Sequence, residues 1–109
     1  MNDEIVLFAD EIGAQRVRVW LEPADGGFML NSHDIGPGLE RFFGDTEIET
    51  YLTIRAEQVP KVAGVLSCGP TLEDVMSTLA NRYRGDSAAT THLRALLDEH
   101  GVPYEFNIV

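Results

Sequence analysis

Hydrophobic and polar residues alternate along much of the first half of the chain, and this two-residue period is typical of β-strands. The alternation is clearest in residues 15–22 and 47–55. The apolar side of these segments carries Val17, Val19 and Leu21 in the first, and Ile48, Thr50, Leu52 and Ile54 in the second. Residues 4–9 and 28–35 predict two further strands, and the Asp-Gly and Gly-Gly pairs in residues 23–27 predict the turn of a hairpin. A short helical turn is expected at residues 39–43.

The second half of the chain changes to a helical period. Residues 59–66 predict one helix, with Pro60 in its first turn. Thr71 has the character of an N-cap for a second helix, whose apolar stripe is Leu72, Val75, Met76, Leu79, Ala80 and Tyr83. Asp86 or Ser87 is expected to cap a third helix, which Gly101 and Pro103 close, and residues 104–109 predict a final short strand. We therefore expect a single α+β domain over residues 1–109, with two layers: a mostly antiparallel sheet and helices packed on one face.

The charge of the chain limits the classes of partner that it is expected to bind. The chain has 18 acidic and eight basic residues, and its formal net charge is −10. Lys61 is the one lysine among the basic residues. This balance argues against direct binding to nucleic acid or to an anionic membrane, since both require basic side chains. No apolar run approaches the ~20 residues of a membrane span, and the N-terminal residues lack the basic start of a secretory signal. The single cysteine, Cys68, fits a reducing compartment, so we expect a cytoplasmic protein.

The acidic residues concentrate in the middle of the chain, where five stand against Arg41 alone between residues 34 and 49. We interpret this stretch as a docking surface for a basic partner protein, with aromatic residues supplying apolar contact. The candidate partner-binding residues are Asp34, Glu40, Phe43, Asp45, Glu47, Glu49 and Tyr51. The alternative is a solvated loop whose acids face water.

Catalytic and metal-binding signatures are not evident. His33 and Asp34 are neighbours on a predicted strand and point to opposite faces, while His92 and His100 lie eight residues apart on a helix. A zinc site needs three or four convergent ligands, so we predict no metal, no cofactor and no enzymatic activity. Trp20 marks a binding surface if it is exposed, but the stems of Arg16 and Arg18 are also able to cover its ring.

Several segments of the sequence resemble parts of known proteins. The segments 33–36, 43–47 and 51–54, and the tail 93–106, resemble small acidic uncharacterised bacterial proteins of the toxin-immunity type. These segments cover less than half of the chain, and no diagnostic motif or site residue comes with them. The resemblance implies a cytoplasmic protein that binds and neutralises a basic toxin, most readily a nuclease.

Several functions therefore remain open. The leading hypothesis is a non-enzymatic inhibitor of a basic protein, acting as a monomer or weak homodimer, either as an immunity protein or as a phage-type inhibitor of a host nuclease. A second is a self-associating structural subunit that pairs through the edge strand at residues 104–109. A third is a small enzyme with His33 or His92 as base and Glu47 and Glu49 as acid–base groups.

Overall fold

A computed structural model describes residues 3–36 and 47–109 of the chain. The strands are β1 (Ile5–Ile12), β2 (Gln15–Ala24), β3 (Gly27–Ile35), β4 (Glu47–Ile54) and β5 (Glu105–Ile108). Between β4 and β5 lie a short 3-10 helix, η2 (Ala56–Gln58), and the helices α2 (Val59–Leu66), α3 (Leu72–Tyr83) and α4 (Ala89–Glu99). The helical turn predicted at residues 39–43 falls outside the described residues.

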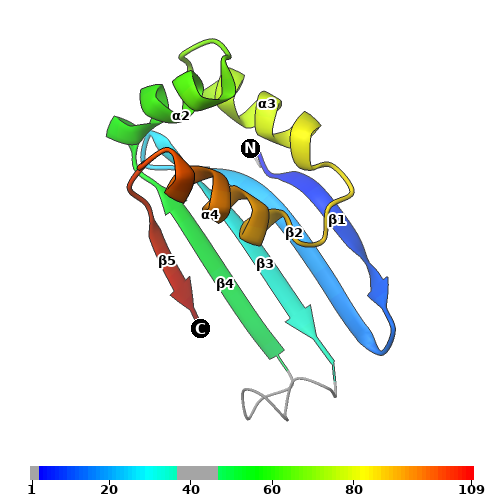
Figure 1. Ribbon diagram of the computed structural model, residues 1–109. Coiled ribbons are helices and arrows are strands. Elements are labelled where there is room, and N and C mark those ends of the chain that lie inside the picture. Colours follow the sequence, from blue (N-terminus) through cyan, green and yellow to red (C-terminus); the bar gives the residue numbers. More distant parts are fainter. Residues whose placement is uncertain (1–2, 37–46) are drawn as a thin grey trace.

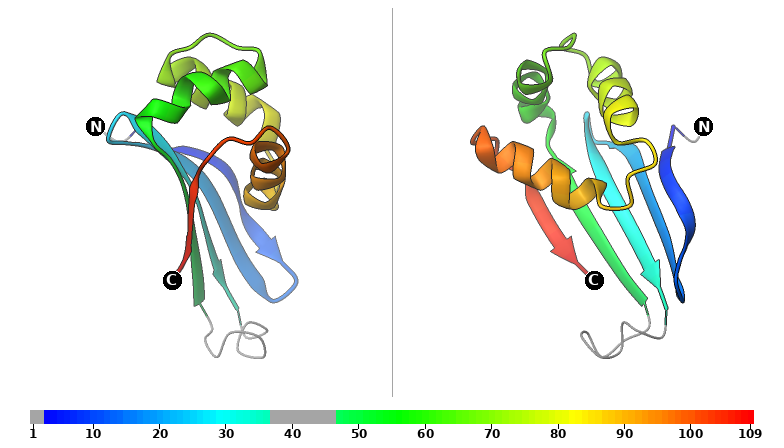
Figure 2. Two further views of the ribbon diagram at one scale, coloured as in Figure 1. Left: turned by 60° about the vertical axis from the view of Figure 1, so that its left-hand side comes forward. Right: turned by 45° about the vertical axis from the view of Figure 1, so that its right-hand side comes forward.

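The strands form one sheet in the order β1-β2-β3-β4-β5, and every neighbouring pair is antiparallel (Figure 1). The first four strands follow one another in space as they do in sequence. β5 arrives after the helices and takes the edge position beside β4. Two turned views show α2, α3 and α4 on the same side of the sheet (Figure 2). The predicted α+β architecture, an antiparallel sheet with helices on one face, is confirmed.

The alternation of apolar residues determines which face of the sheet the helices cover. Val19 and Leu21 of β2, Leu30 of β3, and Leu52 and Ile54 of β4 all point to the helical side and are fully buried. The helices contribute Val62, Val75, Leu79, Leu93 and Leu97 to the same hydrophobic cluster. Each such side chain contributes about 1.5–3 kcal/mol when it leaves water, so this cluster is the main stabilising feature of the fold.

The β2–β3 hairpin turns on two residues, Asp25 and Gly26, whose φ angles are 51° and 82°. Positive φ at both positions is the geometry of the two-residue turns that match the twist of antiparallel strands. Pro23 and Ala24, which the sequence assigned to the turn, instead extend β2 and pair with β3. β1 does not pair with β2 beyond Leu21, so the missing amide hydrogen of Pro23 interrupts no bond to β1.

Local signals account for the helix ends. The side chain of Thr71 accepts a hydrogen bond from the amide of Asp74 at 3.0 Å, as expected of an N-cap. α4 begins at Ala89, and Asp86 accepts a bond from the amide of Ala88 just before it. The amide of Gly85 donates to the carbonyl of Leu7 at 2.8 Å, which ties the α3–α4 connection to β1. Within the described segments, no helix combines the length and apolar character needed to cross a membrane.

The helix-facing side of the sheet becomes polar toward the end of β3 and the start of β4, where the strands extend past the helices (Figure 2). Ser32 and Thr50 lie opposite each other there, and their hydroxyl groups are hydrogen bonded. Asp34 follows on the same face, beside Val17 and Ile48. Partial burial raises the pKa of the Asp34 carboxyl above its usual range, while the charge of neighbouring His33 opposes that shift.

Candidate functional site

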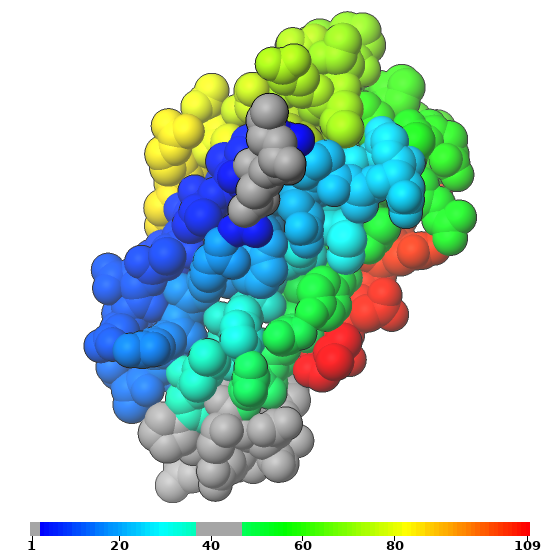
Figure 3. All heavy atoms as spheres, turned by 180° about the vertical axis from the view of Figure 1, so that it is seen from behind, coloured from blue at the N-terminus to red at the C-terminus, as the bar shows by residue number. Residues whose placement is uncertain are grey.

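The face of the sheet opposite the helices is formed by strands (Figure 3). In register, the outward side chains form rows across the sheet. One row runs through Trp20, Asn31 and Tyr51, and the next through Arg18, His33 and Glu49. We call this surface the outer face, and its members from β2 to β4 are Arg16, Arg18, Trp20, Glu22, Met29, Asn31, His33, Ile35, Glu47, Glu49, Tyr51 and Thr53.

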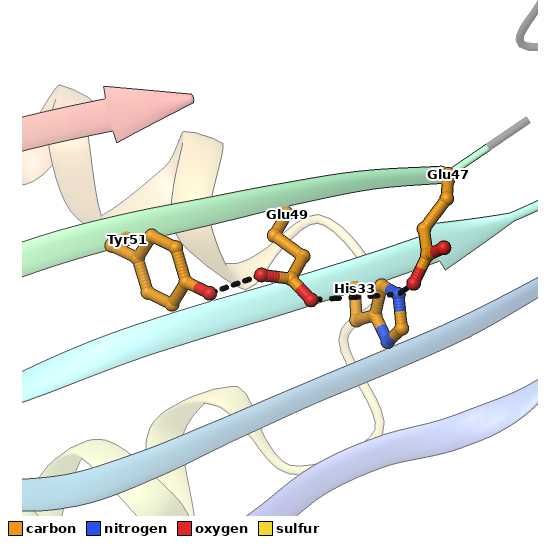
Figure 4. Close-up of polar contacts among 4 residues, drawn as sticks. All are labelled: His33, Glu47, Glu49 and Tyr51. Atoms are coloured by element: carbon orange, nitrogen blue, oxygen red, sulfur yellow. Dashed lines mark hydrogen bonds and ion pairs between the residues drawn. The ribbon is translucent and has the colours of Figure 1, made fainter. Parts of the chain in front are cut away.

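His33, Glu47 and Glu49 converge on the outer face (Figure 4), and we call these three residues the His33 cluster. His33 lies directly opposite Glu49, and Glu47 is one outward position further along β4. The Nε2 atom of His33 is 2.5 Å from Oε1 of Glu47 and 3.8 Å from Oε1 of Glu49. The side chains are 25%, 53% and 35% exposed, in the order His33, Glu47, Glu49. The cluster is thus open to solvent on one side and supported by the sheet on the other.

Tyr51 orients one member of the cluster. Its hydroxyl donates a hydrogen bond to Oε2 of Glu49, which leaves Oε1 of that carboxylate facing His33 (Figure 4). The same bond is the main reason why the pKa of the Tyr51 hydroxyl lies above its usual range. Tyr51 therefore remains protonated and a donor throughout the neutral range.

The arginines near this surface bind other carboxylates. Arg18 forms an ion pair with Glu4, and its guanidinium stacks 4.4 Å from the centre of the Trp20 ring. Arg55 pairs with Glu105 on the edge strand. Within residues 3–36 and 47–109, the side chains in polar contact with Glu47 and Glu49 are those of His33 and Tyr51, and no arginine forms an ion pair with either glutamate. The negative charge of β4 is therefore not neutralised by an arginine of the described chain.

Asn31 is unusual because it is fully buried on the outer face, between Trp20 and Tyr51 in register. Its Nδ2 donates to Glu22, but its Oδ1 has no hydrogen-bond partner among the described atoms. A buried acceptor without a donor costs roughly 1–3 kcal/mol. Asn31 lies two residues from His33 on the same face of β3, so this polar acceptor belongs to the neighbourhood of the His33 cluster.

The residues predicted to bind a partner do not all lie on one surface of the structure. Glu47, Glu49 and Tyr51 share the outer face of β4. Asp34 lies on the opposite, helix-facing side. Glu40, Phe43 and Asp45 fall outside the described residues. The predicted opposition of His33 and Asp34 across the strand is confirmed, but sequence reasoning missed that His33 joins the two glutamates.

The second histidine–carboxylate contact serves the fold. Nδ1 of His92 lies 2.5 Å from Oδ2 of Asp86. The other oxygen of Asp86 accepts the hydrogen bond from Ala88 at the start of α4, so the carboxylate links the helix cap to the first turn. A shallow cavity of about 420 Å³ adjoins it, lined in part by Tyr83, His92 and Leu96. No third ligating side chain of the described chain joins this pair.

A cavity of about 330 Å³ lies on the other side of His33 from the glutamates, over β1 and β2. Its lining includes Ala9, Arg16, Arg18 and Ile35 together with His33. Asp10 and Glu11 line the same cavity, and Arg16 and Arg18 form ion pairs with Glu11 and Glu4, so charges of both signs lie on this side of His33. Comparisons with protein-family models, curated proteins and solved structures found no match to this chain.

Proposed function

We propose that this chain is a non-enzymatic protein that binds and neutralises a basic partner protein through the outer face of β4. The observation that carries the proposal is the pair Glu47 and Glu49, which project from one face with no arginine of the described chain to neutralise them. Like charges held side by side repel each other, and a cationic partner surface relieves that cost. The formal net charge of the whole chain is −10, and this charge adds long-range attraction to a cationic partner.

The neighbouring side chains suit a protein interface. Tyr51 and Trp20 lie in one row with the buried Asn31 between them. Aromatic residues surrounded by polar groups are typical of the positions that contribute most to binding between proteins. Asp34 is not part of this surface because it points to the helical side.

An acidic inhibitor is suited to a basic toxin because complementary charge accelerates association. Rate constants reach about 10⁸–10⁹ M⁻¹s⁻¹ for steered pairs, against about 10⁵–10⁶ for neutral ones. Rapid capture protects a cell that makes a lethal nuclease in its own cytoplasm. The resemblance to toxin-immunity proteins points to the same class, and a phage-type inhibitor of a host nuclease would use the same surface.

A growth assay tests this function. Each reading frame adjacent to the gene for this chain is expressed in a bacterial host, alone and together with the chain. We expect one neighbour to encode a basic domain that stops growth alone and is tolerated when the chain is present. The immunity proposal is wrong if neither neighbour is toxic and neither forms a complex with the purified chain. Rescue by the chain of a host nuclease phenotype would instead favour the phage-type inhibitor.

Self-association is the second candidate, and one observation favours it. β5 is an edge strand, and the last two residues, Ile108 and Val109, are 59% and 75% exposed. The amide of Val109 donates to the backbone carbonyl of Glu49 at 2.8 Å, which extends the β4–β5 ladder, and no strand of the described chain pairs with the other edge of β5. Size-exclusion chromatography with light scattering separates the candidates: a monomer at micromolar concentration contradicts assembly through β5.

A further inference from the structure

We propose that His33, Glu47 and Glu49 form a binding site for one divalent transition-metal ion, with Zn²⁺ as the ion of choice. The site shares Glu47 and Glu49 with the proposed partner surface, but it requires no second protein and is therefore tested separately. It rests on the convergence of three ligating side chains from two paired strands, which sequence reasoning did not predict.

The ligand atoms are already gathered. One ligating atom from each of the three side chains lies within 4.8 Å of the other two. Around a tetrahedral Zn²⁺ with bonds of about 2.0–2.2 Å, neighbouring ligand atoms are about 3.4 Å apart. The contacts of His33 Nε2 with the two glutamate oxygens, 2.5 and 3.8 Å, lie on either side of this value. Binding therefore requires modest side-chain rotations and leaves the pairing of β3 with β4 unchanged.

The chemistry of the ligands selects the class of ion. Two carboxylates and one neutral imidazole give the site a charge of −2, which balances a divalent cation. Imidazole nitrogen suits zinc and related transition metals, whereas calcium and magnesium prefer oxygen ligands alone. Three protein ligands leave one position of a tetrahedral ion for water or for a ligand from another molecule.

The surroundings also suit a metal ion. The Tyr51 hydroxyl holds the Oε2 atom of Glu49, so that Oε1 faces His33 (Figure 4). Hydrogen bonds of this kind to ligating carboxylates are common around metal ions and fix their orientation. Asn31 lies one outward position from His33 on β3, and the Oδ1 of this fully buried side chain has no hydrogen-bond partner among the described atoms. Ordered water or an ion commonly satisfies such an acceptor.

Zinc titration of the isolated, tag-free protein tests the site. Calorimetry at neutral pH is expected to show one saturable site per chain. Glu47→Gln, Glu49→Gln and His33→Gln should each weaken binding at least tenfold, since each removes one of three ligands. Tyr51→Phe should weaken it by about tenfold through the orientation of Glu49. Zn²⁺ should also raise the Tm of the unmodified protein by more than that of the ligand variants, because tighter binding to the folded state gives a larger shift in stability.

The His92–Asp86 pair supplies a matched control. It has the same 2.5 Å contact between imidazole nitrogen and carboxylate but lacks a third described ligand. His92→Gln should therefore leave the zinc affinity unchanged. In the unmodified protein, nitrogen NMR of the imidazole rings should show the metal-bound shift at Nε2 of His33 and no such shift at His92.

The site is disproved if zinc binding is weak, exceeds one ion per chain without saturation, or is equal in the three ligand variants and the unmodified protein. A metal-bound signal at His92 rather than His33 would disprove it as well, even if a variant failed to fold. None of these outcomes affects the proposal of a basic partner, because the titration contains no partner.

Discussion

The two faces of the sheet differ in what their side chains contact. On the helix-facing side, Leu30 and Leu52 lie opposite each other and are fully buried under the helices. On the outer face, the adjacent positions Asn31 and Tyr51 take part in polar contacts: Asn31 donates to Glu22 of β2, and Tyr51 donates to Glu49 of its own strand. The same two strands therefore build a core with one set of alternate residues and a polar, charged surface with the other. Stability should depend on the first face and binding on the second.

A pair of neighbouring substitutions in β4 tests this division with the largest expected effect. Leu52 is fully buried, so Leu52→Ala should lower the free energy of unfolding by about 2–5 kcal/mol through lost contacts and a cavity. Thr53, the next residue, points to the outer face, and Thr53→Ala should cost less than about 1 kcal/mol. Urea unfolding of both variants gives the comparison. Equal losses would mean that the outer face is also part of the core.

One position in the outward phase of β3 should behave like a core position. A Cβ atom on Gly27 would lie 2.0 Å from the carbonyl oxygen of Ile54, which is too close for any real contact. Gly27→Ala should therefore lower the free energy of unfolding by about 1–3 kcal/mol, as overpacking does elsewhere. Gly64, in the exposed part of α2, has open space around its Cα. Gly64→Ala should instead stabilise by roughly 0.5–1 kcal/mol. Denaturation curves with the opposite ranking would contradict the close approach at Gly27.

The exposed ion pairs should matter little for stability. Arg55 and Glu105 link β4 to the edge strand, and both side chains are about half exposed or more. Because solvent screens such pairs, Arg55→Ala should cost far less stability than Leu52→Ala, and the cost should shrink in high salt. Thermal unfolding at low and high salt measures this. A loss as large as that of Leu52→Ala would show that the edge strand is held chiefly by charge.

Asp34 is an acidic residue on the helix-facing side of β3, and its effect on stability should depend on pH. Its folded-state pKa is raised by burial, so the folded protein holds this proton more tightly than the unfolded chain does. The carboxyl therefore lowers stability as the pH rises from the unfolded pKa through the folded one. Asp34→Asn should stabilise slightly at neutral pH, within about 0.5 kcal/mol, and the gain should vanish in acid. The measurement compares the free energy of unfolding of Asp34→Asn with that of the original protein at each pH. A loss of stability at neutral pH that disappears in acid would contradict the predicted sign.

The sequence predicted most of the architecture because local signals agree with the tertiary arrangement. The period-two pattern of β2 and β4 identified the buried faces, and the stripe from Leu72 to Tyr83 identified α3. Element boundaries were less accurate. Pro23 and Ala24 belong to β2 because the turn needs two residues alone. α4 begins after Ala88, although Asp86 or Ser87 was expected at its cap.

The His33 cluster could not be predicted because it depends on the register between β3 and β4. Residues 36–46 connect the two strands, and a connection of that length does not fix which residues pair. The sequence placed Glu47 and Glu49 on one face correctly, but nothing local says that His33 lies opposite Glu49. A one-residue shift in register would have brought Asp34 to that row and moved His33 to the other face.

Charge reversal on the outer face tests the central claim most directly. Glu47→Lys with Glu49→Lys should slow association with a basic partner encoded by the adjacent gene by at least tenfold at low salt, and should flatten the salt dependence. The control, Glu73→Lys with Glu99→Lys, makes the same change in net charge at exposed positions of α3 and α4. Stopped-flow measurements should show a much smaller effect for the control. If both double variants slow association equally, the partner responds to total charge, and the outer face of β4 is not its binding surface.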